Sequence, residues 1–233
     1  YHTMLAQIQH IVPTGHLYRQ RVMAWFMTGI YLGRTVHTSK VANKIPGQAK
    51  RANSTRRLSR FLANGAVRVR TWYEATATAL LQAVAQTGQV RLIIDATQVA
   101  QDHQLLMVAL AYRRRALPIA WTWVCVAKGH SSAWKQAALL SYVHKLMPPQ
   151  VMVVLTGDSE FTPLQAQLER WGWFYVLRQK GSHLYRLHPD QPWRRVESLL
   201  DHAGQRCWLS AIELTEQRRQ HCNFLAYWRP GEK

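Results

Sequence analysis

The segments Val90-Arg91-Leu92-Ile93-Ile94-Asp95 and Val151-Met152-Val153-Val154-Leu155-Thr156-Gly157-Asp158 decide the fold of this chain. Each is a short run of mostly branched aliphatic residues, the pattern of a buried β-strand, and each ends on an aspartate. The end of such a strand holds its carboxylate rigidly at the edge of a sheet. The two segments therefore predict a sheet with two acidic side chains, Asp95 and Asp158, at its edge.

The pattern around these strands predicts an α/β protein in three parts. Residues 1–88 have the spacing of helices, which predicts a helical domain. Residues 89–182 alternate strands with helices, which predicts a mixed sheet with flanking helices. Residues 183–233 show short strands joined by turns. In the middle part, two apolar runs on either side of Arg113-Arg114-Arg115 predict a β-hairpin with a basic tip.

Charge indicates a polyanionic partner. Thirty Lys and Arg stand against twelve Asp and Glu, for a net charge of +18. Residues 1–89 hold twelve basic residues and one acid, which gives +11 for this segment alone. Such a field attracts nucleic acid through its phosphates, whatever the base sequence. A hydrophobic content of 48% with ten tryptophans predicts a folded core and argues against a basic tail.

Two short helices concentrate the N-terminal charge. Ser39 is expected to cap the first, which carries Lys40 and Lys44 and stops at Pro46-Gly47. The second is expected from Asn53-Ser54 to Asn64-Gly65, and its helical spacing separates two faces. Leu58, Phe61 and Leu62 form the face that packs on the domain. The opposite face consists of Asn53, Arg56, Arg57, Arg60 and Asn64.

The polar face of the second helix predicts contact with DNA, because guanidinium groups bind phosphates and base edges. A merely solvated basic face is the alternative from the residues alone. The longest apolar run near the start, Val22 to Leu32, is too short to span a bilayer and predicts a packed helix with no membrane contact. Three cysteines, Cys125, Cys207 and Cys222, lack metal-type spacing and indicate buried thiols in a reducing compartment.

The two strand-end aspartates suit metal-dependent phosphoryl chemistry. That chemistry needs carboxylates that converge on divalent ions roughly 4 Å apart. Mg²⁺, or Mn²⁺ in its place, is held by few carboxylates together with waters and substrate phosphates, so two or three acids suffice, and Asp95 and Asp158 are the candidate ligands. The alternative is that Asp158 only begins the turn Gly157-Asp158-Ser159-Glu160 and that Asp95 only ends its strand.

Several segments, in this order and spacing, resemble the bacterial insertion-sequence DDE transposases. The resemblance covers nearly all of residues 35–233. Its first elements are the run from Leu92 to Thr97 and the hairpin from Tyr112 to Pro118. The others are Gly157-Asp158-Ser159-Glu160-Phe161, Trp171-Gly172-Trp173 and Val176-Leu177-Arg178-Gln179-Lys180-Gly181.

The resemblance implies a helical DNA-binding domain, residues 1–88, followed along the chain by a ribonuclease-H-like catalytic domain. Asp95 and Asp158 would be its first two catalytic acids. The third family acid is a glutamate in a tyrosine–arginine–glutamate–lysine signature beyond a β-rich insertion. Residues 184–228 match the beginning of that insertion, and the signature is not in this sequence. Glu160, Glu213, Glu216 and Glu232 are poor substitutes. We therefore expect a C-terminally truncated enzyme with little activity of its own.

The resulting hypothesis is a transposase that cleaves one strand at each insertion-sequence end. It then uses the freed 3′ hydroxyl of that strand to attack target DNA. Its partner is double-stranded DNA, and the resemblance implies a homodimer in the bacterial cytoplasm, associated with the nucleoid. The alternatives are a metal-dependent nuclease of the same fold and a DNA-binding remnant that represses transposition. Arg113, Arg114 and Arg115 are expected to contact DNA near the metal ions, and the alternative is that they only solvate the hairpin tip. Lys128-Gly129-His130 is a weaker phosphate candidate, followed by Ser131 as a plain helix cap.

Overall fold

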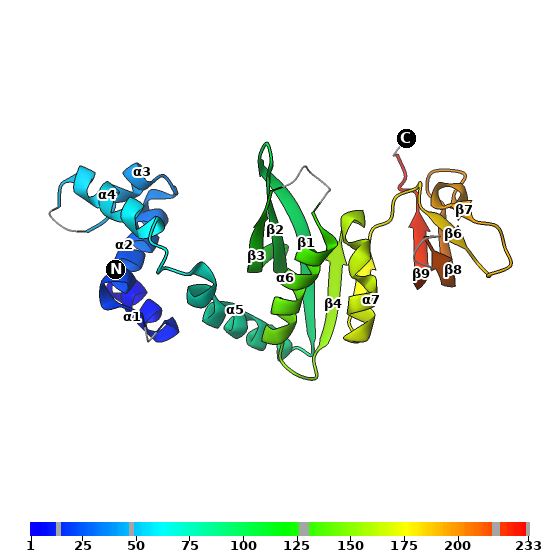
Figure 1. Cartoon of the computed structure of the whole chain (residues 1–233), viewed down its shortest axis with the longest axis horizontal. Helices are drawn as coiled ribbons and strands as arrows, with labels where there is room; N and C mark the ends of the chain where they lie inside the picture. The colour runs from blue at the N-terminus through cyan, green and yellow to red at the C-terminus, as the bar shows by residue number, and fades with distance from the viewer. Residues whose placement is uncertain (13–14, 47–48, 126–130, 216–219, 232–233) are drawn as a thin grey trace. The chain divides into compact units, whose positions relative to one another are not determined.

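The computed structural model describes residues 1–12, 15–46, 49–125, 131–215 and 220–231. It confirms the expected mixed α/β fold, in which a helical N-terminal region precedes a five-stranded mixed sheet with flanking helices (Figure 1). The chain divides into two compact units, residues 1–80 and 81–233. The expected division between residues 182 and 183 stays a prediction. No helix among the described residues is both long and apolar enough to cross a bilayer.

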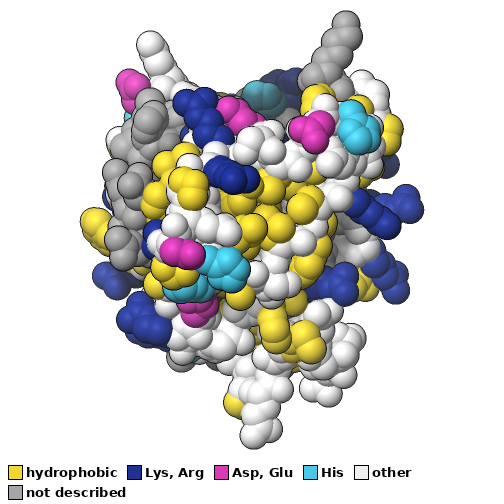
Figure 2. All heavy atoms as spheres, turned by 90° about the vertical axis from the view of Figure 1, so that its right-hand side faces the viewer, with side chains coloured by type: hydrophobic (Ala, Val, Ile, Leu, Met, Phe, Trp, Pro, Cys, Tyr) yellow, Lys and Arg dark blue, Asp and Glu magenta, His cyan; other side chains and the backbone are white. Residues whose placement is uncertain are grey.

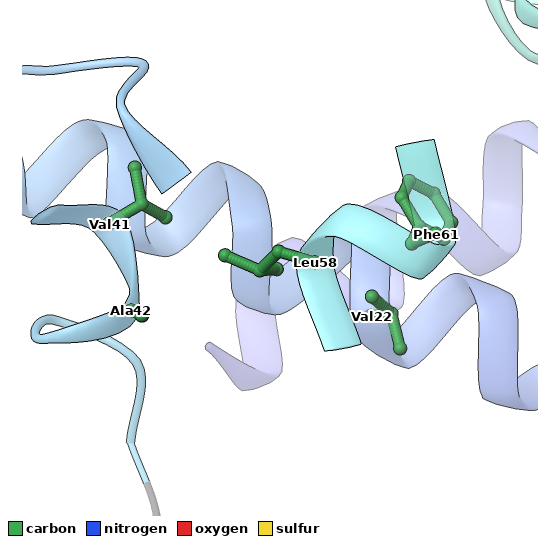
Figure 3. Packing of buried hydrophobic residues seen from close by; sticks show 5 residues of the cluster. All are labelled: Val22, Val41, Ala42, Leu58 and Phe61. Carbon is green, nitrogen blue, oxygen red and sulfur yellow. The ribbon is translucent and has the colours of Figure 1, made fainter. Parts of the chain in front are cut away.

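The first unit is built from helices. They are α1 (His2–Ile11), α2 (Leu17–Gly33), α3 (Thr38–Ala42), α4 (Arg51–Leu62) and the beginning of α5 (Val69–Ala85). Figure 3 shows the core where α2, α3 and α4 meet, formed by Val22, Val41, Ala42, Leu58 and Phe61. Gly29 allows α2 to approach α3, because a Cβ at this position would lie 2.6 Å from Val41 Cγ1.

Two details of these helices differ from expectation. Helix α3 begins at Thr38 with no side-chain cap, so the prediction that Ser39 caps it is wrong. Helix α4 begins at Arg51, before the expected start at Asn53-Ser54, and Ser54 is a buried residue within the helix. Leu58 and Phe61 are buried as predicted, but Leu62 is 57% exposed. The buried face of α4 consists of Ser54, Leu58 and Phe61. Leu62 is the last residue of the helix and lies outside this face.

The second unit contains the five-stranded sheet. Its strands are β1 (Gln89–Ala100), β2 (His103–Tyr112), β3 (Arg115–Val124), β4 (Met152–Gly157) and β5 (Phe174–Leu177), in the order β3-β2-β1-β4-β5. Strands β1, β2 and β3 pair antiparallel, whereas β1, β4 and β5 pair parallel. Helix α6 (Ala133–Leu146) packs against β2 and β3, and helix α7 (Gln165–Arg170) packs against β5. Figure 1 labels both helices beside the sheet.

Strand β1 shows how the sequence builds this sheet. Val90, Leu92 and Ile94 are almost completely buried. The residues between and after them are more exposed, and Asp95 lies on that other side of the strand. Because successive side chains point to opposite faces, the buried face fixes the direction of the Asp95 side chain.

A smaller sheet follows, with the order β7-β6-β8-β9. Its elements are β6 (Leu184–Arg186), β7 (Arg194–Arg195), the 3₁₀ helix η2 (Val196–Leu199), β8 (Arg206–Leu214) and β9 (Gln220–Tyr227). Tyr185, Ile212, Leu214, Phe224 and Ala226 form its core. Figure 2 views this side of the molecule and shows exposed hydrophobic side chains together with basic ones. Exposed large residues of this sheet include Trp208, Leu225 and Tyr227.

The cysteines are free. Cys207 and Cys222 are partly buried, whereas Cys125 is exposed. The expectation of three buried thiols is therefore wrong for Cys125, because this residue directly follows the last residue of β3 and lies outside the packed part of the strand.

Candidate functional site

Asp95 and Asp158 occupy equivalent positions on neighbouring strands. Strands β1 and β4 run parallel, and their register pairs Ile94 with Gly157. Each aspartate is the next residue along its chain, and Asp158 continues the extended backbone of β4. Neighbouring strands lie about 4.8 Å apart, and side chains at paired positions point to the same face. The structure thus brings the two carboxylates, hereafter the carboxylate pair, to neighbouring positions where β4 ends. The prediction that Asp95 ends its strand is wrong, because β1 pairs with β2 beyond Asp95 and continues to Ala100.

The carboxylate pair is oriented by matching hydrogen bonds. Asp95 Oδ1 accepts a bond of 2.8 Å from the backbone N–H of Ala96. Asp158 Oδ1 accepts one of 2.7 Å from the N–H of Ser159, and Asp158 is also the N-cap of the 3₁₀ helix η1 (Ser159–Leu164). In both residues Oδ2 has no hydrogen bond within the described chain. Each exposed side chain therefore keeps one oxygen available to a ligand.

Gly157, the residue before Asp158, allows β4 to pack closely against the Ile94 side chain of β1. A Cβ at this position would lie 2.8 Å from Ile94 Cγ2 and 3.1 Å from Phe161 Cδ2. The hydroxyl of Thr156 further fixes the register of the two strands by donating a 3.1 Å hydrogen bond to the carbonyl of Leu92. The structural role of Gly157 is to let β4 pack on the Ile94 side chain.

Gly157→Ala is expected to destabilise the second unit by about 1–3 kcal/mol, because the added methyl overpacks a full site. Urea unfolding measures the loss, and hydrogen exchange of the β1 and β4 amides assigns it to this sheet. Gly65→Ala is the control, since a Cβ there meets no atom within 4 Å. Equal stability of the two variants would contradict the close packing around Gly157.

The segment after Asp158 is anchored to the start of α6. The backbone N–H of Ser131 donates to Glu160 Oε1 at 2.8 Å, and the Ser131 hydroxyl donates to the same oxygen. The buried Gln136 side chain donates to Ser131 Oγ at 2.8 Å. Ser131 is therefore not the plain cap that we expected, since Ser132 holds the N-cap position without a side-chain bond. Lys128-Gly129-His130 lies outside the described residues.

The donor set is suited to a divalent cation of the magnesium type. No group of three or more His, Cys, Asp or Glu side chains that could hold a metal occurs among the described residues. Two neighbouring carboxylates match the preference of Mg²⁺ for one or two protein carboxylates completed by waters and phosphates. A structural zinc site, with four protein ligands, does not fit this arrangement.

A second feature lies in the first unit, where a groove of about 710 Å³ opens between α2 and α4. We call it the basic groove. All five residues of the polar face predicted for α4 line it. The sequence reading missed the residues contributed by the beginning of α2. The lining is His16, Tyr18, Arg19, Asn53, Arg56, Arg57, Arg60, Phe61 and Asn64.

Several contacts orient the wall of the basic groove. The Arg57 guanidinium lies 4.9 Å from the centre of the Trp25 ring, a cation–π contact. Asn64 Oδ1 accepts a 3.0 Å hydrogen bond from the N–H of Ala66. In the described part of this unit, Arg56 and Arg60 have no carboxylate partner, and Glu74 on α5 is the only acid in residues 1–80. The groove therefore offers uncompensated positive charge.

Lys40 and Lys44 do not join the basic groove. Lys40 lies on α3 and Lys44 just after that helix, and both side chains are exposed. Neither residue lines the groove. Their predicted contact with DNA stays a prediction that would involve a different part of the surface.

The basic hairpin tip is present, but not near the carboxylate pair. Strands β2 and β3 are joined by Arg113 and Arg114, and Tyr112 pairs with Arg115. Asp95 pairs with Met107, six residues before Arg113, which is roughly 20 Å along the strand. The prediction that these arginines lie near the metal ions is therefore wrong. Strand β2 runs antiparallel to β1 and carries the tip to the opposite end of the sheet.

Comparison with known proteins adds no relative, because no protein-family model and no curated protein matches the sequence. The chemistry of the carboxylate pair and of the basic groove therefore carries the functional assignment. Both features combine on one chain: acids suited to a divalent cation, and an acid-free arginine surface.

Proposed function

We propose that this chain is the DNA-binding and catalytic part of a bacterial insertion-sequence DDE transposase, acting on double-stranded DNA as a homodimer in the cytoplasm at the nucleoid. The observation that carries the proposal is the register of β1 and β4, which sets Asp95 and Asp158 at equivalent positions on adjacent parallel strands. The basic groove of the first unit supports a DNA substrate.

In this proposal the carboxylate pair holds Mg²⁺ or Mn²⁺ through the oxygens that the Ala96 and Ser159 amides leave unused. Divalent ions held there would supply activation of the attacking oxygen and stabilisation of the leaving oxygen for displacement at phosphorus. Water cleaves one phosphodiester at each element end. The freed 3′ hydroxyl then attacks a target phosphodiester, and the displaced target strand leaves with its own 3′ hydroxyl.

The basic groove has the role of holding the element end. The guanidinium groups of Arg56 and Arg60 bind backbone phosphates, and Arg57 is positioned over Trp25. Asn53 lines the same groove and can pair with an adenine edge through its amide. Phosphate contacts fix the register of the protein on the duplex, whereas base contacts select the sequence.

The other glutamates described in the second unit are engaged elsewhere. Glu160 accepts from Ser131, and Glu213 pairs with Arg186 at 2.5 Å. Glu169 accepts a 2.7 Å hydrogen bond from the Tyr175 hydroxyl, and Glu197 pairs with Arg195 at 3.1 Å. Glu216 and Glu232 lie outside the described residues. None of the described glutamates thus has the role of the third family acid.

The 233-residue chain alone is therefore expected to show no more than trace Mg²⁺-dependent nicking of a plasmid that carries the element ends. Two carboxylates position the ions less firmly than three. Gel analysis of nicked circles against a metal-free reaction measures this activity. Robust nicking by this chain would contradict the need for a third acid.

A chain extended by a segment with the third acid tests the proposed function. Transposase activity predicts both strand cleavage and strand joining at element ends in Mg²⁺. Cleavage without joining would instead identify a nuclease. Repression of transposition that survives replacement of Asp95 and Asp158 by Ala would identify a DNA-binding repressor.

A further inference from the structure

The turn between β2 and β3 has an unusual composition for its backbone conformation. Arg113 has φ 44° and Arg114 has φ 64°, so both residues of this two-residue turn are left-handed. Hairpins of this kind favour Asn-Gly, since glycine and asparagine adopt positive φ at little cost. A long side chain on an L residue is disfavoured there because of the clash between Cβ and the backbone. We call Arg113, Arg114 and Arg115 the arginine turn.

Interactions within the fold do not account for the arginine turn. All three side chains are exposed. The Arg113 guanidinium lies 5.3 Å from the centre of the exposed Tyr112 ring, whereas Arg114 and Arg115 have no ion pair among the described residues. The chain thus accepts backbone strain in order to present guanidinium groups to solvent. Strain of this kind persists mainly where function requires it.

The surroundings of the arginine turn are also basic. Arg91, near the beginning of β1, lies toward this end of the sheet and is exposed. Asp95, Asp158 and Glu160 lie toward the other end, as does Asp102 in the turn that joins β1 to β2. These four acids therefore lie away from the arginine turn.

We propose that the arginine turn is a second DNA-binding site on the catalytic unit, which binds backbone phosphates of a duplex without regard to base sequence. This site is separate from the carboxylate pair, since roughly 20 Å of strand lies between them, about the length of six base pairs. The inference rests on the proposed function only in taking DNA as the substrate.

The test replaces the two residues of the turn by residues that favour the same backbone conformation. Arg113→Asn together with Arg114→Gly supplies the favoured turn residues and removes two charges. This variant of the 233-residue chain is expected to unfold at a higher urea concentration than the parent. Its affinity for a 30-base-pair duplex of arbitrary sequence is expected to fall on the order of tenfold or more at 0.1 M salt. The slope of log K against log salt should shrink by about 2.

Two control variants show whether a loss of affinity comes from the arginine turn itself or from the lower net charge. Arg194→Gln with Arg195→Gln removes the same number of exposed charges from β7 and is expected to change affinity less than about threefold. Arg113→Lys with Arg114→Lys keeps the charges and is expected to retain binding. If the Asn-Gly variant binds DNA as tightly as the β7 variant, the arginine turn is not a DNA site. If the parent itself does not bind duplex DNA, the proposed function fails as well.

Discussion

Asp95→Asn or Asp158→Asn is expected to lower the rate of strand cleavage by about a thousandfold in the chain extended by the third acid. Asparagine keeps an oxygen that can accept the hydrogen bond now made to the next amide, so the local fold is preserved. It removes the negative charge that attracts the cation. The loss corresponds to about 4 kcal/mol of transition-state stabilisation, within the range that a metal ion contributes.

The measurement is single-turnover cleavage of a labelled element end in Mg²⁺, with DNA affinity determined in parallel. DNA affinity is expected to stay within about threefold of the parent, because phosphate binding is assigned to the basic groove and to the arginine turn, not to the carboxylate pair. Asp102→Asn is the matched control. Asp102 is an exposed carboxylate just beyond the end of β1, outside the carboxylate pair, and its loss is expected to leave cleavage unchanged. Normal cleavage by either of the two active-site variants would contradict the assignment.

Arg56→Gln together with Arg60→Gln is expected to weaken binding of the element end by about a hundredfold. Hydrogen bonds to a charged group contribute about 1.5 kcal/mol or more each, and every 1.4 kcal/mol is a factor of ten. Both side chains line the basic groove and have no carboxylate partner in the described part of unit 1. Fluorescence anisotropy between 50 and 200 mM salt measures the affinity, and the salt slope should fall by about 2.

The control for the groove removes two charges just outside it. Lys50→Gln with Arg51→Gln changes the exposed beginning of α4, and neither residue lines the groove. This variant is expected to lose less than about threefold in affinity. Equal losses for both double variants would mean that the overall positive field binds DNA and that the groove has no special role.

The sequence predicted the strands and helices of the five-stranded sheet better than their spatial relations. The aliphatic runs before Asp95 and Asp158 identify both strands, because a short run of branched aliphatic residues is typical of a buried strand. The parallel pairing of Ile94 with Gly157 joins residues far apart in sequence. No local pattern encodes that register. It depends on contacts between the two strands, such as the Thr156 hydrogen bond to Leu92 and the close packing at Gly157.

The basic groove was likewise predicted only as far as it depends on a single helix. The helical spacing of α4 predicted its polar face, because that face depends on a single helix. His16, Tyr18 and Arg19 lie on another element and come to the groove through packing of α2 on α4. The acid-free stretch around Arg19 was the only sequence signal for them. The arginine turn was misplaced for a related reason, since nearness to Asp95 along the chain does not indicate nearness across an antiparallel hairpin.

The central claim is that one divalent cation binds to both members of the carboxylate pair. Titration of the ¹⁵N-labelled chain with Mn²⁺ tests it most directly, since a bound paramagnetic ion broadens the amide signals near it. The account predicts that the amides of Ala96 and Ser159 broaden together, and that Asp95→Asn alone abolishes the broadening of both. Broadening of only one of them, or a Ser159 signal that still broadens in the Asp95→Asn variant, would contradict a shared site.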